Sequence, residues 1–245
     1  MDGDTTLQQR YEAVRSRIET ACRMAARSPD QVTLLAVSKT FSAARVLDLA
    51  DCGQRRFGEN YLQEAIAKIS ECAIQRPDWR LEWHFIGPIQ SNKTRPIAEH
   101  FDWVHSVDRE RVARRLAEQR PTHLPPLQVC IQVNIGAEDT KSGCEPHEAS
   151  ALAHLVAGLP SLRLRGLMAI PRPETDPAAQ QGQFARVREL FEQLQAEGLA
   201  LDTLSMGMSD DLEAAVAQGA TIVRVGSALF GRRTKGAAEG DATVA

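Results

Sequence analysis

A lysine stands at the end of a short apolar run near the start of the sequence. Residues 34–37 are Leu-Leu-Ala-Val, and Ser38 and Lys39 follow them. A lysine in this position ordinarily extends its amine into solvent, because a lysine is rarely buried without a partner. Where the amine is partly buried, its pKa falls, and the neutral amine can attack a carbonyl carbon to form a Schiff base. Position alone leaves both interpretations of Lys39 open.

Two turns that contain glycine and serine stand near the end of the sequence. The first is Gly207-Met208-Ser209, and the second is Gly226-Ser227. The backbone amides of such turns can bind an anion, since glycine has no Cβ and lets the anion approach closely. Alternatively, Ser209 only caps the helix that we expect after it, and Gly226-Ser227 is an ordinary turn. Each turn alone favours this structural interpretation, but the two together favour a phosphate site.

An arginine lies within the apolar run that precedes the second turn. Arg224 alternates with Val223 and Val225. If the two valines face the helices of an α/β fold, the arginine points to the opposite side, into the interior of the sheet. A buried guanidinium needs acceptors, so Arg224 is expected either to pair with a carboxylate on a neighbouring strand or to contact a ligand.

The lysine, the two turns and the arginine together match one small molecule, pyridoxal 5′-phosphate (PLP). Its aldehyde reacts with a lysine, its phosphate suits the glycine and serine turns, and its ring nitrogen can accept a hydrogen bond from an arginine. We predict no metal site, because the six histidines and five cysteines have no metal-ligand spacing. His84 is interpreted as a hydrogen-bonded strand histidine, and its expected place near the same rim leaves a role as a base open. Glu64 and Lys68, four residues apart, are expected to pair on a solvent-exposed helix face.

The elements that must position these residues alternate between short β-rich runs and amphipathic helical runs. An N-terminal helix is expected from Leu7, capped by Asp4 or Thr5 and ended by Ser28-Pro29-Asp30. The predicted strands are 33–37, 56–57, 82–86, 103–105, 127–133, 163–167, 203–204 and 221–225. The predicted helices lie near 42–50, 60–74, 91–100, 108–119, 146–158, 178–197 and 209–218.

This alternation predicts a parallel α/β sheet. Eight strands in about 200 residues favour a closed (β/α)8 TIM barrel with an extra N-terminal helix. We expect one domain over residues 1–233 and a disordered tail over 234–245. In such a barrel the site lies at the carboxyl ends of the strands, where Lys39, Ser209, Gly226 and Ser227 would meet.

Composition indicates an ordinary globular protein. Lysine and arginine number 29 against 32 aspartates and glutamates, for a net charge of −3, and 43% of the residues are hydrophobic. This balance argues against a nucleic-acid partner or an anionic membrane surface, which need clustered basic charge. No apolar stretch is long enough to span a membrane. The unpaired cysteines and the absence of a secretory leader favour the cytoplasm. A barrel closes its own sheet, so a monomer is expected.

The chain resembles the pyridoxal-phosphate homeostasis protein family from about residue 6 to 233. The resemblance is carried by an ordered set of segments: 36–40 (Ala-Val-Ser-Lys-Thr), 57–61 (Phe-Gly-Glu-Asn-Tyr), 83–93 (Trp-His-Phe-Ile-Gly-Pro-Ile-Gln-Ser-Asn-Lys), 204–211 (Leu-Ser-Met-Gly-Met-Ser-Asp-Asp) and 223–227 (Val-Arg-Val-Gly-Ser). It implies a fold like the barrel domain of alanine racemase. It also implies Lys39 as the aldimine lysine, Ser209, Gly226 and Ser227 as phosphate ligands, Arg224 facing the pyridine nitrogen, and Asn60 and Met168 near the ring.

The resemblance implies a protein that binds and buffers PLP, or delivers it to PLP-dependent apoenzymes, without an established reaction. A charged arginine at the ring nitrogen disfavours protonation there and weakens the ring as an electron sink, which agrees with a cofactor that is bound without taking part in catalysis. Nothing after residue 231 is expected to form the second domain that completes alanine racemase. Two enzymatic alternatives stay open, namely a PLP-dependent amino-acid racemase or lyase and a class I Schiff-base aldolase.

Overall fold

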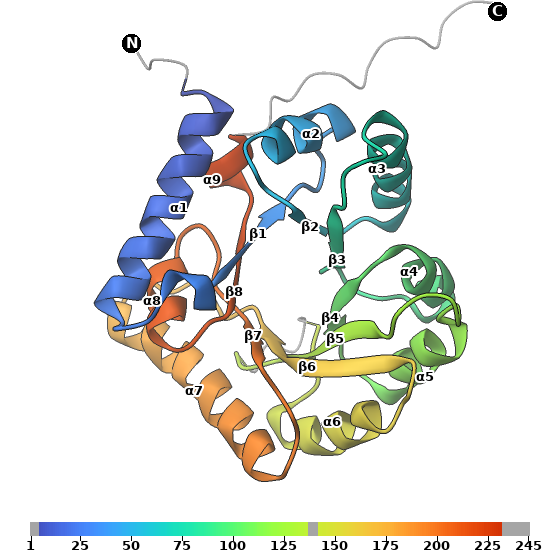
Figure 1. Ribbon diagram of the computed structural model, residues 1–245. Coiled ribbons are helices and arrows are strands. Elements are labelled where there is room, and N and C mark those ends of the chain that lie inside the picture. Colours follow the sequence, from blue (N-terminus) through green and yellow to red (C-terminus); the bar gives the residue numbers. More distant parts are fainter. Residues whose placement is uncertain (1–4, 137–141, 232–245) are drawn as a thin grey trace, which may run out of the picture.

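Eight parallel strands follow one another around a ring, and helices surround the ring (Figure 1). The computed structural model describes residues 5–136 and 142–231. The strands are β1 (Thr33–Val37), β2 (Arg56–Glu59), β3 (Glu82–Phe85), β4 (Trp103–Val107), β5 (Leu127–Val133), β6 (Leu162–Ala169), β7 (Thr203–Ser205) and β8 (Ile222–Val225). The tail that we expect to be disordered, residues 234–245, lies outside the described residues.

The first and last strands pair and close the ring. Thr33 of β1 is aligned with Ile222 of β8, and Leu35 is aligned with Arg224. Each strand also pairs in parallel with the strand that follows it in sequence. These pairings confirm the predicted (β/α)8 barrel.

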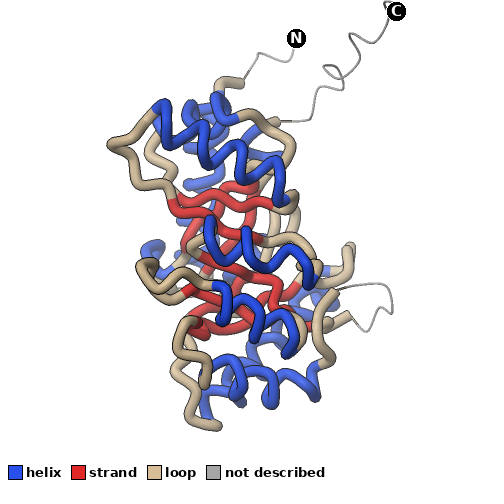
Figure 2. The backbone as a smooth tube through the Cα atoms, turned by 90° about the vertical axis from the view of Figure 1, so that its right-hand side faces the viewer, coloured by secondary structure: helices blue, strands red, loops and turns tan. Residues whose placement is uncertain are grey.

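The helices lie outside the ring, so that the strands are enclosed between helices when the molecule is seen from the side (Figure 2). The α-helices are α1 (Leu7–Met24), α2 (Ala43–Asp51), α3 (Leu62–Gln75), α4 (Thr94–His100), α5 (Glu110–Gln119), α6 (Ala149–Ala157), α7 (Pro177–Ala196), α8 (Leu212–Ala217) and α9 (Ser227–Phe230). Single 3-10 turns precede β1, α4 and α6, at Pro29–Gln31, Ser91–Lys93 and Pro146–Glu148. No helix in the described part of the chain has the length and apolar character needed to traverse a membrane.

The N-terminal helix α1 is the extra element that the sequence predicts, and it packs against α8 and α9. Its cap is Thr6 rather than Asp4 or Thr5, because the Thr6 hydroxyl accepts from Gln9 N at 3.2 Å and the Thr6 backbone N–H donates to Gln9 Oε1 at 2.9 Å. Arg17 pairs with Glu213 of α8 at 2.9 Å. The helix therefore fixes the two elements that follow β7 and β8.

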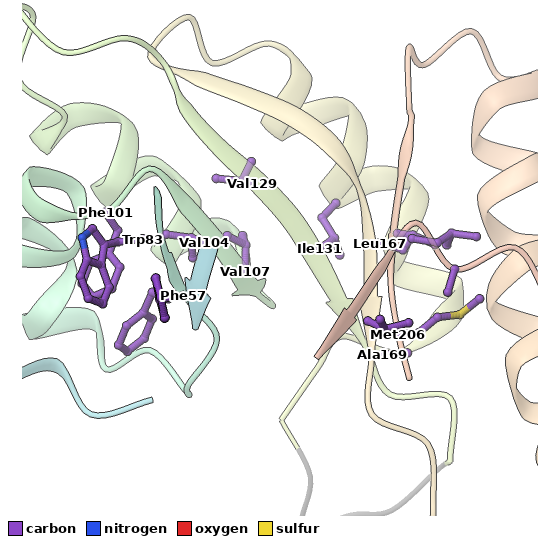
Figure 3. Close-up of a cluster of buried hydrophobic side chains, with 14 of the residues drawn as sticks. Phe57, Trp83, Phe101, Val104, Val107, Val129, Ile131, Leu167, Ala169 and Met206 are labelled. Carbon is purple, nitrogen blue, oxygen red and sulfur yellow. The ribbon is translucent and has the colours of Figure 1, made fainter. Parts of the chain in front are cut away.

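The hydrophobic core has two parts because strand side chains alternate between the helices and the barrel interior. The larger part lies between strands and helices, and Figure 3 shows Phe57, Trp83 and Phe101 within it. The smaller part fills the ring itself, with one side chain from each of β1, β4, β5, β6 and β8: Leu35, Trp103, Cys130, Met168 and Ile222. The ring is packed and does not form an open channel.

Three boundaries differ from the prediction in ways that affect the site. β2 extends to Glu59, which places this glutamate inside the strand. β6 extends to Ala169, so Met168 belongs to the strand rather than to the loop after it. The helix predicted at 209–218 begins only at Leu212, and the short helix α9 was not predicted.

Candidate functional site

A pocket of about 490 Å³ lies where β1, β7 and β8 end. It gathers four of the residues singled out in the sequence, Lys39, Ser209, Gly226 and Ser227. The remaining lining residues are Val37, Phe41, Met208, Asp210 and Gly231. Closure of the ring causes this meeting, because β1 and β8 are neighbours in the barrel although they lie at opposite ends of the chain. A pocket of this size is in the range that holds a small organic ligand.

Lys39 sits in a tight turn that is held at several points. The turn is closed by a hydrogen bond from Phe41 N to Ser38 O at 3.0 Å. Thr40 adopts a φ of 69°, which is unfavourable for a β-branched residue. Its backbone N–H donates to Glu64 Oε1 at 2.6 Å, and this contact supports the strained conformation. The backbone at Lys39 is thus fixed, while its half-buried side chain lines the pocket.

A buried ion pair lies directly beneath this turn. Lys68 Nζ donates to Glu59 Oε1 at 2.6 Å, to Ser38 O at 2.8 Å and to Glu64 Oε1 at 3.0 Å. The side chains of Lys68 and Glu59 are 3% and 0% exposed. The prediction that Lys68 and Glu64 pair on a solvent face was therefore wrong for Lys68. Its aliphatic stem and amine enter the layer between α3 and the barrel, where Glu59 needs a counter-charge.

Burial and pairing act in opposite directions on Glu59. Burial raises the pKa of its carboxyl group, and the lysine ammonium and the Ser38 hydroxyl lower it without cancelling the effect of burial. Glu59 Oε1 accepts from Ser38 Oγ at 2.6 Å as well as from Lys68. Its Oε2 atom is buried and has no hydrogen-bond partner within the described structure. Lys68 is therefore the cation on which the buried carboxylate depends.

The turn after β7 differs from its predicted form. The helix α8 begins at Leu212, so Ser209 does not cap it. Instead, Met208 N donates to Asp211 Oδ1, and Arg17 donates to Ser209 O at 3.0 Å. Gly207 has a φ of +94°, and a Cβ there would lie 2.5 Å from Ala215 Cβ, so this position requires glycine. The turn is rigid, and it presents Ser209 to the pocket without the aid of a helix terminus.

Arg224 lies inside the barrel, on the side opposite to Val223 and Val225, as its alternation with them predicts. Its guanidinium donates to the Ser205 carbonyl, to Ser205 Oγ at 2.9 Å and to Ala169 O at 2.9 Å. No carboxylate of the described residues contacts it, so the alternative of a structural ion pair is not what the structure shows. Burial lowers the pKa of Arg224 to about 10, which leaves it charged near neutral pH.

Arg224 does not line the pocket, and neither do the other two predicted residues. Met168 is fully buried in the barrel interior beside Leu35 and Trp103. Asn60 follows β2 and lines a separate hollow, together with Tyr61 and Lys93. The Asn60 Oδ1 atom is buried without a partner among the described residues.

His84 is a hydrogen-bonded strand histidine, but it does not lie at the predicted rim. It lines a hollow of about 860 Å³ at the amino ends of the strands, with Glu82 and Trp103. His84 Nε2 contacts Glu82 Oε1 at 2.9 Å, and its Nδ1 contacts His105 Nε2 at 2.8 Å. Sequence spacing gave no signal for the pair, because His84 and His105 meet only through the neighbouring strands β3 and β4. No group of three metal-ligating side chains occurs in residues 5–136 and 142–231.

Because His84 and His105 are buried, we expect the folded protein to lose stability in mild acid. Burial lowers the pKa of His84 below its ordinary 6.5, and burial next to His84 and Arg224 lowers the pKa of His105 further. The folded protein thus binds fewer protons than the unfolded chain once the pH falls below about 6.5. The free energy of unfolding should then fall by up to about 1.4 kcal/mol per pH unit for each histidine. Urea denaturation between about pH 7 and pH 5 measures this slope.

The variant His123→Gln provides the control for this measurement, because His123 is exposed. It should reproduce the pH profile of the wild type. A flat profile in the wild-type protein over the same range would mean that both buried histidines take up a proton in the folded state as readily as in the unfolded chain.

A family model described as alanine racemase, N-terminal domain, matches residues 10–234. A curated protein of Pseudomonas aeruginosa named pyridoxal phosphate homeostasis protein is 60% identical over 233 residues, which cover 95% of this chain and 98% of that protein. The Escherichia coli protein of the same name is 52% identical over 223 residues and covers 90% of this chain and 94% of its own. Among solved structures, PipY of Synechococcus elongatus with PLP bound is 38% identical, with a TM-score of 0.78 over 92% of this chain and 100% of that one.

Proposed function

The chain belongs to the pyridoxal phosphate homeostasis family, whose barrel is that of the alanine racemase N-terminal domain, and on that premise we propose that its pocket binds PLP. One observation carries the proposal. The half-buried Lys39, just beyond the end of β1, shares one pocket with the serine and glycine turns that follow β7 and β8. The family members named above and the PLP-bound PipY structure support the same ligand.

The residues present suit the chemical groups of PLP. Bound in this pocket, PLP supplies an aldehyde that condenses with a lysine amine and releases water. Lys39 provides that amine, and Ser209, Ser227 and the backbone at Gly226 hold the phosphate. A Cβ on Gly226 would lie 3.3 Å from Val37 O, so this turn already passes close to β1 and gains space from the absence of a side chain. Arg224 would face the ring nitrogen as a donor, whereas Asn60 and Met168, which do not line this pocket, are given no contact with PLP.

We infer that the protein stores and releases PLP rather than using it for catalysis. Racemization or lyase chemistry needs acid and base groups placed at the reacting carbon. Of the described residues that line the pocket, only Lys39 and Asp210 are ionisable. Arg224 cannot readily lose a proton, which keeps the ring nitrogen unprotonated and the ring a weak electron sink.

The position of the pocket suits exchange with its surroundings. Met208, Asp210 and Ser227 are exposed at its edge, so a bound molecule can enter and leave without a change of fold. We propose a monomer that takes up PLP in the cytoplasm and yields it to PLP-dependent apoenzymes.

A borohydride-trapping experiment tests the proposal. The protein is incubated with PLP, reduced with borohydride and mapped by peptide mass spectrometry. A phosphopyridoxyl group on Lys39 is expected. Modification of another lysine only, or of none, would refute the assignment. Turnover of amino acids by the loaded protein would replace the storage function by a racemase or lyase function, and a colourless protein that binds sugar phosphates would indicate the aldolase.

Replacing Ser209 by alanine is expected to weaken PLP binding. The loss of one hydrogen bond to a charged phosphate costs about 1–2 kcal/mol, or roughly a 5- to 30-fold rise in Kd. Fluorescence titration of the variant against the wild type measures this change. Ser70→Ala, on the exposed face of α3, is the matched control and should bind as the wild type does. An unchanged Kd for the Ser209 variant would mean that the phosphate lies elsewhere.

A further inference from the structure

A continuous chain of hydrogen bonds crosses the barrel interior from Arg224 to the opposite face. Arg224 Nη1 contacts Ser205 Oγ at 2.9 Å, and Ser205 Oγ contacts His105 Nδ1 at 2.7 Å. His105 Nε2 contacts His84 Nδ1 at 2.8 Å, and His84 Nε2 contacts Glu82 Oε1 at 2.9 Å. Ser205, His105 and His84 are completely buried. The chain thus joins the arginine behind the proposed PLP site to the hollow at the amino ends of the strands.

The two ends of the chain determine the direction of every hydrogen bond in it. A carboxylate only accepts, so the Nε2–H of His84 donates to Glu82, and a neutral His84 accepts at Nδ1. His105 must then donate from Nε2 and accept at Nδ1, which requires the Ser205 hydroxyl to donate to it. Arginine only donates, and Ser205 Oγ accepts from Arg224. All four protons point from the arginine towards the carboxylate.

Charged groups around the chain agree with this assignment. Burial raises the pKa of Glu82, but its contacts with His84 and Arg56 lower it by more, so it is ionised at neutral pH. Burial lowers the pKa of His84, although Glu82 and Asp102 oppose this effect, and Arg56 adds to it. The chain therefore runs between a cation and an anion through neutral imidazoles.

His105 is the most constrained member of the chain. Burial, His84 and the Arg224 guanidinium all lower its pKa. A second proton on His105, at Nδ1 in addition to Nε2, would force the Ser205 hydroxyl to turn away and would place a second positive charge beside Arg224. The neutral form with the proton on Nε2 is thus the one that satisfies both neighbours.

We propose that Ser205, His105 and His84 are positioning residues that, anchored by Glu82, hold the Arg224 guanidinium as a fixed donor towards the PLP ring nitrogen. The effect on PLP rests on the proposed function, whereas the row of hydrogen bonds from Arg224 to Glu82 does not. No carboxylate contacts Arg224 within the described residues, so its orientation depends on two backbone carbonyls and on Ser205 Oγ. The Ser205 hydroxyl can accept from Arg224 in this geometry because its own hydrogen points to His105 Nδ1, to which it donates a hydrogen bond.

The first test needs no ligand. Long-range ¹H–¹⁵N NMR of the ligand-free wild-type protein reports which imidazole nitrogen carries the proton. Neutral His84 and His105 are expected near neutral pH, each protonated at Nε2. A charged imidazole, or a proton on Nδ1 of either residue, would overturn the proposed direction of the chain. This result does not depend on whether the protein binds PLP.

The second test asks whether the chain acts on the ring nitrogen. Two probes are compared, PLP and an analogue whose ring nitrogen is replaced by C–H. Ser205→Ala should raise the Kd for PLP about five- to tenfold and leave the Kd for the analogue unchanged, because the analogue offers Arg224 no acceptor. Cys130→Ala is the control, since it shortens another fully buried side chain of the barrel interior, and both probes should bind to it as to the wild type.

The outcomes separate the two proposals. An equal loss of affinity for both probes in Ser205→Ala would show that the serine supports only the fold of the pocket, and would overturn the positioning role. An unchanged affinity for PLP would overturn it as well. If the wild-type protein binds neither probe, the proposed function fails and the positioning role fails with it, while the NMR assignment of the chain stands or falls separately.

Discussion

Replacing Lys39 by alanine is expected to abolish covalent attachment of PLP. The pocket at the ends of β1, β7 and β8 contains one amine from the described residues, and that amine is Lys39. Without it, the aldehyde has no nucleophile within the pocket, so the loaded protein should lose its yellow colour and gain no phosphopyridoxyl mass after borohydride reduction. Visible absorbance and intact-protein mass spectrometry measure the two effects.

The proposed phosphate ligands are expected to give the Lys39 variant some residual binding of PLP. Ser209, Gly226 and Ser227 remain in place, so weak reversible binding should persist and should weaken further when Ser209→Ala is added. Lys93→Ala is a stringent control, because Lys93 is exposed and lines the hollow beside Asn60. The Lys93 variant should gain the same phosphopyridoxyl mass as the wild type after borohydride reduction. Full labelling of the Lys39 variant would place the reactive amine elsewhere and would remove the basis of the proposed function.

Replacing Lys68 by methionine is expected to cause the largest loss of stability. The substitution shortens the side chain by one atom and leaves the fully buried carboxylate of Glu59 without its cation. Removing one partner of a buried ion pair typically costs about 3–5 kcal/mol, because the remaining charge stays desolvated. Chemical denaturation followed by circular dichroism measures the change in the free energy of unfolding.

A double variant separates the ion pair from simple packing. Glu59→Gln combined with Lys68→Met removes both charges and should recover much of the lost stability. Glu64→Gln is the control for the other carboxylate in contact with Lys68, since its side chain is 35% exposed and should contribute little. If Lys68→Met loses less than about 1 kcal/mol, Glu59 is protonated in the folded protein and does not require the lysine.

The barrel could be predicted from the sequence because its signal is repetitive. Each strand is a short run that contains apolar residues and is followed by a helical run, and the order of these units determines the order of strands in the ring. The boundaries were less predictable. Ser209 was expected to begin a helix, but the Met208–Asp211 contact forms a turn there and delays α8 to Leu212. That contact depends on side-chain geometry that local propensity does not describe.

The site was predictable where it depends on strand ends alone. Lys39, Ser209, Gly226 and Ser227 each lie within four residues of the end of a strand, and in a barrel such positions meet at one rim. Arg224 was predictable as an inward residue because its alternation with two valines gives its direction. The roles of Asn60 and Met168 came from family resemblance, and the structure places both outside the pocket that holds Lys39.

The buried polar partners were not predictable, because they connect elements through register. Glu59 has the same strand parity as Phe57 and so faces the helices, which was a sign that a cation must lie opposite. The choice of Lys68 depends on how α3 packs. His84 and His105 likewise meet across β3 and β4, where a shift of one residue would separate them.

The pocket joins the first strand of the barrel to the last one, and this has a consequence for synthesis on the ribosome. A polypeptide released before β8 is made carries Lys39 but lacks one wall of the pocket, so it cannot retain PLP. Ligand that binds only the closed ring also stabilises the closed ring, by an amount set by the ratio of free ligand to Kd. Binding of PLP is therefore expected to distinguish translation products that include β8 from shorter ones. It should also protect the closed barrel from proteolysis to an extent that rises with the concentration of free PLP.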